Sequence, residues 1–357
     1  MIDLDDIKRI LELQGGDLVI KSIDNLPRQL EQSFKDSYNI SFPEDFKTVN
    51  RIVVCGQGGS RFPSFIIKEL FKEELAVPYI INDDYSLPGF VDNNTLVILS
   101  SYSGTTEEVL ICGEKAVKKG AKICGITIGG DLKTFLEKNN YPRYVIDPVF
   151  NPSGQPRIGF GYFVGGHLGM LFKLGFIKSA RQEIEQSISN LSNLIKDFKV
   201  DIGKDNNQIK QLATKLYQRY PYYIVSEFLT GIGNSIANQT NETAKSISSF
   251  RIIPELNHHF LEGLKFPDKL KEILTFVFFY SNLYSTKIQK RFAITKDVVE
   301  QNKISTLWYE LKGKNKIEQT FELMAIGSYL SMYLSVLYEQ NPKIIPYVDY
   351  FKKRLAE

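Results

Sequence analysis

Apolar residues in this chain gather in short runs that alternate with amphipathic stretches. Residues 51–55 and 95–99 are apolar at almost every position, which is typical of strands buried on both faces of a parallel sheet. The residues that follow such a run have the spacing of a helix, first at 63–71 and again at 107–119. This alternation predicts βαβ units in the first half of the chain. The same pattern places further strands at 78–81, 121–128 and 144–146.

The alternation begins again in the second half of the chain. An apolar, glycine-rich stretch at 157–177 predicts a long helix that bridges the two halves, and residues 182–198 are amphipathic. We therefore expect an α/β fold of two similar units that arose by internal duplication, each a mainly parallel sheet flanked by helices. Residues 1–155 would form N-terminal helices plus the first unit, and residues 156–357 the linking helix plus the second. The second unit has predicted strands at 222–226, 250–253, 274–280 and 306–311, and predicted helices at 236–246, 317–338 and 350–355.

Composition narrows the possible partners. A chain of 357 residues with 43% apolar and 24% charged residues can bury two substantial cores. The net charge of only +3 gives no reason to expect a nucleic acid or an anionic membrane as partner. The three cysteines, Cys55, Cys112 and Cys124, lack zinc-site spacing, so we expect buried free thiols.

Nothing in the sequence predicts export or membrane insertion. The acidic start, Met1-Ile-Asp-Leu-Asp-Asp6, lacks the basic and apolar regions of a signal peptide. No apolar run reaches the expected length of a membrane span, and residues 274–280 are short enough for a buried strand. We expect a soluble, cytoplasmic protein.

Two loops that follow predicted strands contain the most informative chemistry. Ser101-Tyr-Ser-Gly-Thr-Thr-Glu107 brings hydroxyl groups to the start of a predicted helix, where unpaired N–H groups and the helix dipole favour an anion. Cys55-Gly-Gln-Gly-Gly-Ser60 adds glycines that permit close backbone approach. Phe62 and Pro63 stand where a dinucleotide fingerprint would have its third glycine. Because both loops end parallel strands, they can meet at one sheet edge and hold a phosphate.

These motifs carry a family resemblance. The two loops resemble those of the sugar isomerase (SIS) domain, a flavodoxin-like α/β unit that binds phosphosugars. From about residue 50 to the end, the motifs stand in the order found in bifunctional phosphoglucose/phosphomannose isomerases of archaea and some bacteria. Besides the two loops, the resemblance rests on Pro156-Arg157, Asn241-Glu242-x-Ala-Lys245, Pro254-Glu-Leu-Asn-His258 and Tyr350-Phe-Lys-Lys-Arg-Leu355.

The resemblance implies two SIS-type domains and an aldose–ketose isomerase acting on fructose 6-phosphate and glucose 6-phosphate, with mannose 6-phosphate as a further substrate left open. Glu242 would be the base that moves a proton between C2 and C1, and Arg157 would stabilise the cis-enediolate. His258 and Lys352 would assist ring opening, with His258 donated across a homodimer interface. No cofactor is needed for a proton transfer, and no metal site is expected among the three histidines. The phosphate would be held by Gly59, Ser60, Ser101, Ser103 and Thr106.

Two other functions remain open from the sequence. A non-catalytic phosphosugar-binding regulator would keep the phosphate loops without a working base, and an amino-sugar phosphate isomerase or deaminase-like enzyme would use the same fold. Taken singly, Glu242 and Lys352 also fit solvated helix surfaces, and Arg157 fits a structural ion pair. The chain departs from the family pattern at Ser235-Ile236, His259, the residues after Arg157, and Asn341-Pro-Lys343. These departures bear on which epimer is turned over and on the level of activity.

Overall fold

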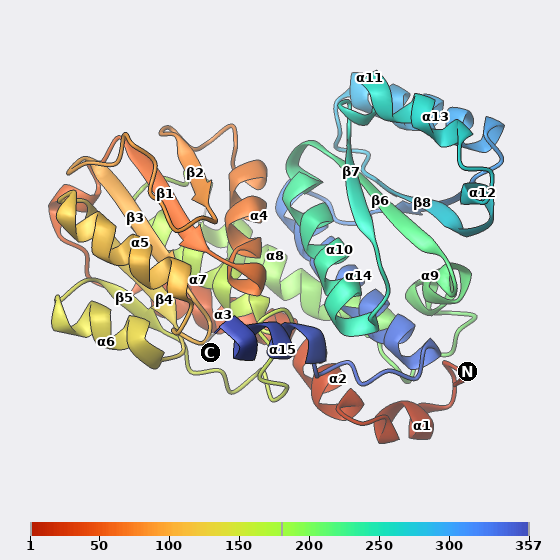
Figure 1. The fold of residues 1–357 in the computed structure, drawn as a ribbon, viewed down its shortest axis with the longest axis horizontal. Helices are drawn as coiled ribbons and strands as arrows, with labels where there is room; N and C mark the ends of the chain where they lie inside the picture. Colours follow the sequence, from red (N-terminus) through yellow and green to blue (C-terminus); the bar gives the residue numbers. More distant parts are fainter. Residues whose placement is uncertain (1, 180, 356–357) are drawn as a thin grey trace. The chain divides into compact units, whose positions relative to one another are not determined.

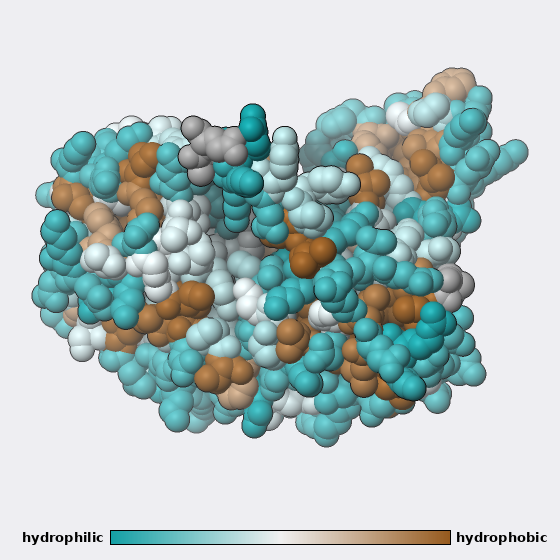
Figure 2. Space-filling model, turned by 60° about the horizontal axis from the view of Figure 1, so that its bottom comes forward, coloured by the Kyte–Doolittle hydropathy of each residue, from teal (hydrophilic) through white to brown (hydrophobic). Residues whose placement is uncertain are grey.

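The protein is described by a computed structural model that covers residues 2–179 and 181–355, and it divides into two compact units. The first, which we call the N-terminal sheet unit, consists of Asn25–Leu191 with Phe228–Ile232. The second, the C-terminal sheet unit, consists of Met1–Asp24, Ser192–Glu227 and Gly233–Glu357. Figure 1 shows one sheet in each. The face drawn in Figure 2 is mainly hydrophilic and carries several separate hydrophobic patches.

The N-terminal sheet unit contains a five-stranded parallel sheet in the order β2-β1-β3-β4-β5. From β1 the chain continues to β2 at one edge of the sheet, and from β3 it continues to β4 toward the other edge, so the strand order reverses between β1 and β3. Ligands of open α/β sheets bind at such a point. Gly56 of β1 lies opposite Ser100 of β3, which aligns the carboxyl ends of the two strands. The strands are β1 Arg51–Gly56, β2 Tyr79–Asn82, β3 Thr95–Ser100, β4 Lys122–Thr127 and β5 Arg143–Val145.

Helices cover both faces of this sheet. Helix α5 (Glu107–Lys118) packs on one face, where Val109, Cys112 and Ala116 share a buried cluster with strand residues. Helix α7 (Phe160–Lys173) is buried along almost its whole length and packs closely against α3 (Leu26–Tyr38). A Cβ on Gly165 of α7 would stand 2.6 Å from the backbone oxygen of Leu30, so only glycine permits this approach of the two helices.

His167 lies within α7 and is fully buried. Neither ring nitrogen has a hydrogen-bond partner among the described residues, and burial lowers the pKa of this histidine to about 3. The ring is therefore neutral at physiological pH and packs edge-on against Phe163. His167 is therefore a residue of helix packing.

The C-terminal sheet unit repeats the topology. Its four parallel strands have the order β7-β6-β8-β9, the same order as the first four strands of the other sheet. This repetition agrees with a duplicated α/β unit and confirms the expected fold class. The strands are β6 Tyr220–Ser226, β7 Ser249–Ile253, β8 Leu274–Tyr280 and β9 Ser305–Glu310.

One expectation about the C-terminal sheet unit was wrong. Helix α14 (Lys316–Leu337) is long and apolar enough, by length and composition alone, to cross a membrane, although the sequence pattern indicated no such run. Nearly every residue of this helix is buried within the fold. It therefore has the properties of the central core helix of a globular unit, packed by α9 (Gln208–Leu216) and α2 (Gly16–Asp24).

Other boundaries differ in detail from the sequence-based prediction. The helices without a predicted counterpart include α6 (Gly130–Lys138), α9, and α13 (Thr286–Gln301). Helix α7 begins at Phe160 rather than at 157, because the preceding residues form a turn in which the Ile158 N–H donates to the Gln155 carbonyl (3.1 Å). The remaining helices are α1 Ile7–Glu12, α4 Phe62–Leu70, α8 Arg181–Leu194, α10 Thr230–Ala244, α11 Leu256–His259, α12 Leu270–Ile273 and α15 Pro346–Leu355.

Candidate active site

The two predicted phosphate loops lie side by side in the N-terminal sheet unit. Each follows one of the neighbouring strands β1 and β3, and Ser60 joins them. The Tyr102 N–H donates to Ser60 Oγ (2.8 Å), and Ser100 Oγ donates to the Ser60 carbonyl (2.8 Å). A hydroxyl that accepts one such bond can still donate its own proton to an anion.

In the second loop, residues 101–106, hydroxyl groups bond to one another and to the loop backbone. Ser101 Oγ and Thr106 Oγ1 are 2.7 Å apart, and Ser101 Oγ also accepts from the Gly104 N–H (3.1 Å). Ser103 is exposed and pairs instead with Thr105, its Oγ 2.9 Å from Thr105 Oγ1. Thr106 is the N-cap of α5, whose first N–H groups and positive dipole end point at this loop. The loop thus offers hydroxyl and backbone donors at one helix end, as phosphate binding requires.

Arg157 belongs to the same site. A Cβ on Gly59 would stand 2.9 Å from the Arg157 backbone nitrogen, so the first loop packs directly on the Pro156-Arg157 peptide. The Arg157 side chain is only 1% exposed, and its Nη1 donates to Gln155 Oε1 (3.0 Å). A buried guanidinium held in this way keeps its charge and a fixed orientation.

The residues that connect Arg157 to the loops were not predicted from the sequence. Tyr102 is buried and stacks on Phe163 of α7, with ring centroids 5.9 Å apart. Its Oη accepts from Asn151 Nδ2 (2.8 Å), and the same amide donates to the Gln155 carbonyl (3.1 Å). Tyr102 lies inside the Ser-Tyr-Ser motif, which was the only available signal; Asn151 and Gln155 had none.

Glu242 stands in the last turn of α10, in the C-terminal sheet unit, and is partly buried. Lys245, just beyond the helix, donates from Nζ to the Glu242 carbonyl (2.7 Å) and to the Asn341 carbonyl (2.9 Å). On the other side, Asn241 Oδ1 accepts from the Ser248 N–H (2.7 Å). Asn241 and Lys245 therefore fix the end of the helix that presents Glu242. Asn341, one of the positions that departs from the family pattern, lies against this helix end.

His258 lies on α11 and is exposed. Its neighbour Asn257 anchors this short helix to α13, because Asn257 Nδ2 donates to Thr295 Oγ1 (2.7 Å). His258 and His259 line a cavity of about 290 Å³ next to Lys265. Glu242 precedes strand β7 in the chain and His258 follows it, so the two residues stand beyond opposite ends of this strand. The structure does not bring them together within one chain.

Lys352 lies on α15, none of whose residues is buried. Apolar side chains on this helix are exposed too, among them Tyr347 (88%) and Phe351 (62%). The structure thus leaves Lys352 on an exposed helix at the surface of the C-terminal sheet unit.

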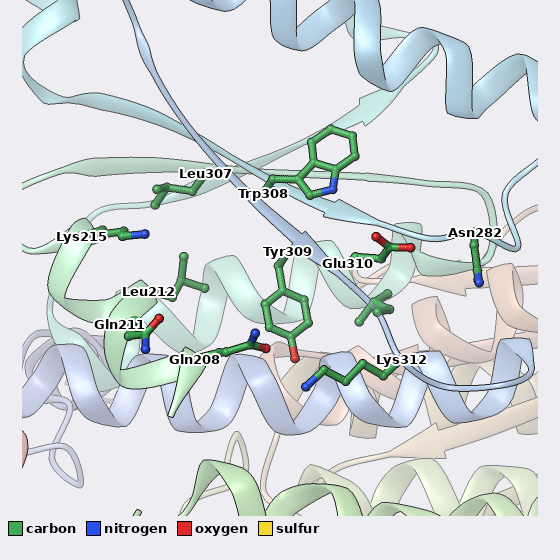
Figure 3. A pocket seen from close by; sticks show the side chains of 11 residues that line it. Gln208, Gln211, Leu212, Lys215, Asn282, Leu307, Trp308, Tyr309, Glu310 and Lys312 are labelled. Atoms are coloured by element: carbon green, nitrogen blue, oxygen red, sulfur yellow. The ribbon is translucent and has the colours of Figure 1, made fainter. Parts of the chain in front are cut away.

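A larger cavity of about 640 Å³ lies elsewhere in the C-terminal sheet unit, between α9 and the edge strand β9 (Figure 3). Trp308 and Tyr309 point to opposite faces of the strand there, and Trp308 is 41% exposed. None of the residues predicted for the site lines this cavity, and its polar groups include Gln208, Lys215 and Glu310. Among residues 2–179 and 181–355, no group of three or more His, Cys, Asp and Glu side chains could hold a metal ion.

Known proteins resemble this chain along most of its length. Residues 205–355 match the family model of the bacterial phospho-glucose isomerase C-terminal SIS domain. A bifunctional phosphoglucose/phosphomannose isomerase from Caldicellulosiruptor bescii is 33% identical over 95% of this chain and 99% of its own. The corresponding protein of Thermoplasma acidophilum is 30% identical over 89% of this chain and 94% of its own.

Solved structures extend the likeness to the fold. Tagatose-6-phosphate ketose/aldose isomerase from Escherichia coli superposes with a TM-score of 0.70 at 14% identity, covering 92% of this chain and 96% of its own. On the similarity to the Caldicellulosiruptor protein along almost its entire length, this chain belongs to the bifunctional phosphoglucose/phosphomannose isomerase family.

Proposed function

We propose that this protein, in the cytoplasm, interconverts fructose 6-phosphate with glucose 6-phosphate. We propose mannose 6-phosphate as a second aldose substrate. The observation that carries the proposal is the linked set of Ser60, Ser101, Thr106 and Arg157, because phosphate donors and a buried guanidinium are held in one hydrogen-bonded framework. Family membership supplies the reaction class.

In the proposed mechanism, the loops hold the phosphate, and that binding energy positions the reacting carbons of the open-chain sugar. Glu242 takes the proton from C2 of the aldose, or from C1 of the ketose, and returns it to the neighbouring carbon. The resulting cis-enediolate carries negative charge that exists only during the reaction, and Arg157 stabilises it. His258 and Lys352 move protons between the ring oxygen and the C1 hydroxyl when the ring opens.

A coupled assay tests the proposal. We expect the purified protein to convert fructose 6-phosphate into glucose 6-phosphate, read out by glucose-6-phosphate dehydrogenase, at a rate that EDTA leaves unchanged. Tight binding of fructose 6-phosphate without turnover would contradict the enzyme and favour a regulator. A parallel reaction started from mannose 6-phosphate decides whether both epimers are substrates.

We further propose that the active form is a homodimer in which each site receives His258 from the other subunit. Strand β7 separates Glu242 from His258, and its five residues span roughly 16 Å. A histidine beyond the far end of this strand cannot share a proton with a sugar at Glu242 of the same chain. The exposed apolar side chains of α15 also suit a helix that a second subunit covers.

Mixing two inactive variants tests this arrangement. A heterodimer of Glu242→Gln and His258→Ala subunits has one site with both changes and one site with neither, if the histidine crosses the interface. We expect each variant alone to be nearly inactive and a refolded equimolar mixture to recover about a quarter of wild-type activity, because half of the dimers are mixed and each has one intact site. A mixture with no more activity than its components would show that His258 acts within its own chain.

A further inference from the structure

Two cysteine thiols meet directly beneath the phosphate loops. Cys55 is the residue of β1 that precedes Gly56, where the first loop begins, and Cys112 lies in α5, which begins where the second loop ends. Both side chains are buried in one cluster between the sheet and α5. The third cysteine, Cys124 of β4, is not part of that cluster.

Contacts of Asn82 show how close the two sulfur atoms are. Asn82 lies opposite Cys55 in the β1–β2 register, and its Nδ2 stands 3.9 Å from Cys55 Sγ and 3.4 Å from Cys112 Sγ. One amide group therefore touches both sulfurs. Cys112 Sγ also donates to the Asp84 carbonyl (3.2 Å).

The surroundings make the two thiols chemically unequal. Pairing with Cys55 lowers the pKa of Cys112, which burial alone would raise, and the positive charge of Lys115 lowers it further. The same pairing, together with burial, raises the pKa of Cys55. Cys112 thus has the greater thiolate character, which is the property that selects a cysteine for attack on an oxidant.

Access to Cys112 is through a surface loop. The Asp84 carbonyl that accepts from Cys112 belongs to residues 83–86, all of which are exposed. This segment follows the edge strand β2, and its bonds to α5 include exposed ones, from Lys115 Nζ to the Tyr85 carbonyl (2.8 Å) and from Tyr85 Oη to Glu107 Oε2 (3.1 Å). Local opening of such a loop requires little free energy compared with global unfolding.

We propose that Cys55 and Cys112 form an oxidisable dithiol, which hydrogen peroxide converts into an intramolecular disulfide. The Cys112 thiolate attacks the O–O bond, becoming a sulfenic acid and releasing hydroxide. Cys55 sulfur then displaces the hydroxyl group, its proton leaves with that group as water, and the S–S bond forms. In total, two thiols are oxidised and one peroxide is reduced to two waters.

The bond would act on the phosphate loops. It draws the two sulfurs, which both contact Asn82 Nδ2, together to about 2.05 Å, and so moves the end of β1 relative to α5. Both loops are continuous with these elements, so we expect oxidation to weaken phosphosugar binding. This consequence rests on the proposed function, whereas formation of the disulfide does not.

Thiol counting after treatment of the folded protein tests whether the disulfide forms. After treatment with hydrogen peroxide, quenching and denaturation, we expect the wild type to fall from three reactive thiols to one, with a peptide linking residues 55 and 112 detected by mass spectrometry. Cys124→Ser is the matched control and should fall from two thiols to none. Cys55→Ser and Cys112→Ser should form no intramolecular disulfide. Three remaining thiols in the wild type, or a link that includes Cys124, would overturn the proposal.

Calorimetric binding of fructose 6-phosphate tests whether the disulfide weakens phosphosugar binding, and it does not require turnover. We expect oxidation to raise the Kd roughly fivefold or more in the wild type and in Cys124→Ser, a range typical of coupled sites, and dithiothreitol to restore it. The Kd of Cys112→Ser should not respond to peroxide. A linked protein that binds fructose 6-phosphate as tightly as the reduced form would refute the effect on the loops, and absence of binding by the reduced protein would instead refute the proposed function.

Discussion

Replacing Glu242 by glutamine is expected to lower kcat for fructose 6-phosphate by about 10³-fold and to leave KM within about threefold of the wild type, because general base catalysis typically contributes 10²–10⁴. Glutamine keeps the size of the side chain, and the anchors of the helix end, Asn241 and Lys245, act through other atoms. The amide, however, has no basic oxygen that can accept the C2 proton. Initial rates in the coupled assay measure the effect, and circular dichroism confirms the fold.

Glu310→Gln is the matched control for this prediction. Glu310 lines the larger cavity beside β9 and is exposed, so the same chemical change there separates the two candidate sites. We expect its kcat to stay within about twofold of the wild type, as for an ordinary surface substitution. If Glu310→Gln were inactive and Glu242→Gln active, the cavity of Figure 3 would become the candidate active site.

Periodicity alone predicted the sheets well, because their strands are buried on both faces. Residues 274–280 were expected as a strand and form β8 with the same bounds, since an unbroken apolar run fits few other structures. Helix α9 was missed because it is short and begins after a polar stretch, although Asn207 caps it by accepting from the Ile209 N–H (3.0 Å). Helix α14 was expected, yet its apolar length was underestimated because serine and tyrosine residues interrupt the hydrophobic pattern.

The candidate site was predictable only where a motif is local. Ser60, Ser101 and Thr106 follow strands that become neighbours, so their meeting at one sheet edge follows from the βαβ pattern. Arg157 could be assigned only by resemblance, because what places it is the packing of its backbone on Gly59, nearly a hundred residues away in the chain. The roles of Asn241 and Lys245 likewise depend on tertiary contacts with Ser248 and Asn341 that no spacing rule encodes.

The second large effect is expected from Gly104→Ala in the phosphate loop. Gly104 has φ +75°, and a Cβ there would stand 1.9 Å from the Gly129 carbonyl oxygen and 2.9 Å from Thr127 Oγ1. The Gly129 carbonyl belongs to the backbone and cannot rotate away. The Gly104 carbonyl also accepts from the Leu132 N–H (2.8 Å), so the segment at Gly104 cannot move away from the segment at Gly129 without breaking this bond. We expect roughly 3 kcal/mol loss of unfolding free energy from this strain and overlap.

Function should suffer as well, since Ser101 Oγ accepts from the Gly104 N–H (3.1 Å) and displacing this loop misplaces the phosphate donors. We expect KM for fructose 6-phosphate to rise by about tenfold or more, equivalent to about 1.4 kcal/mol of lost binding. Gly175→Ala separates backbone strain from steric overlap, because Gly175 has φ +80° but no heavy atom within 4 Å of the position that a Cβ would take. It should lose only about 1 kcal/mol from backbone strain and keep its KM. Chemical denaturation and steady-state kinetics on both variants measure these effects, and an unchanged KM in Gly104→Ala would show that the loop from Ser101 to Thr106 does not hold the phosphate.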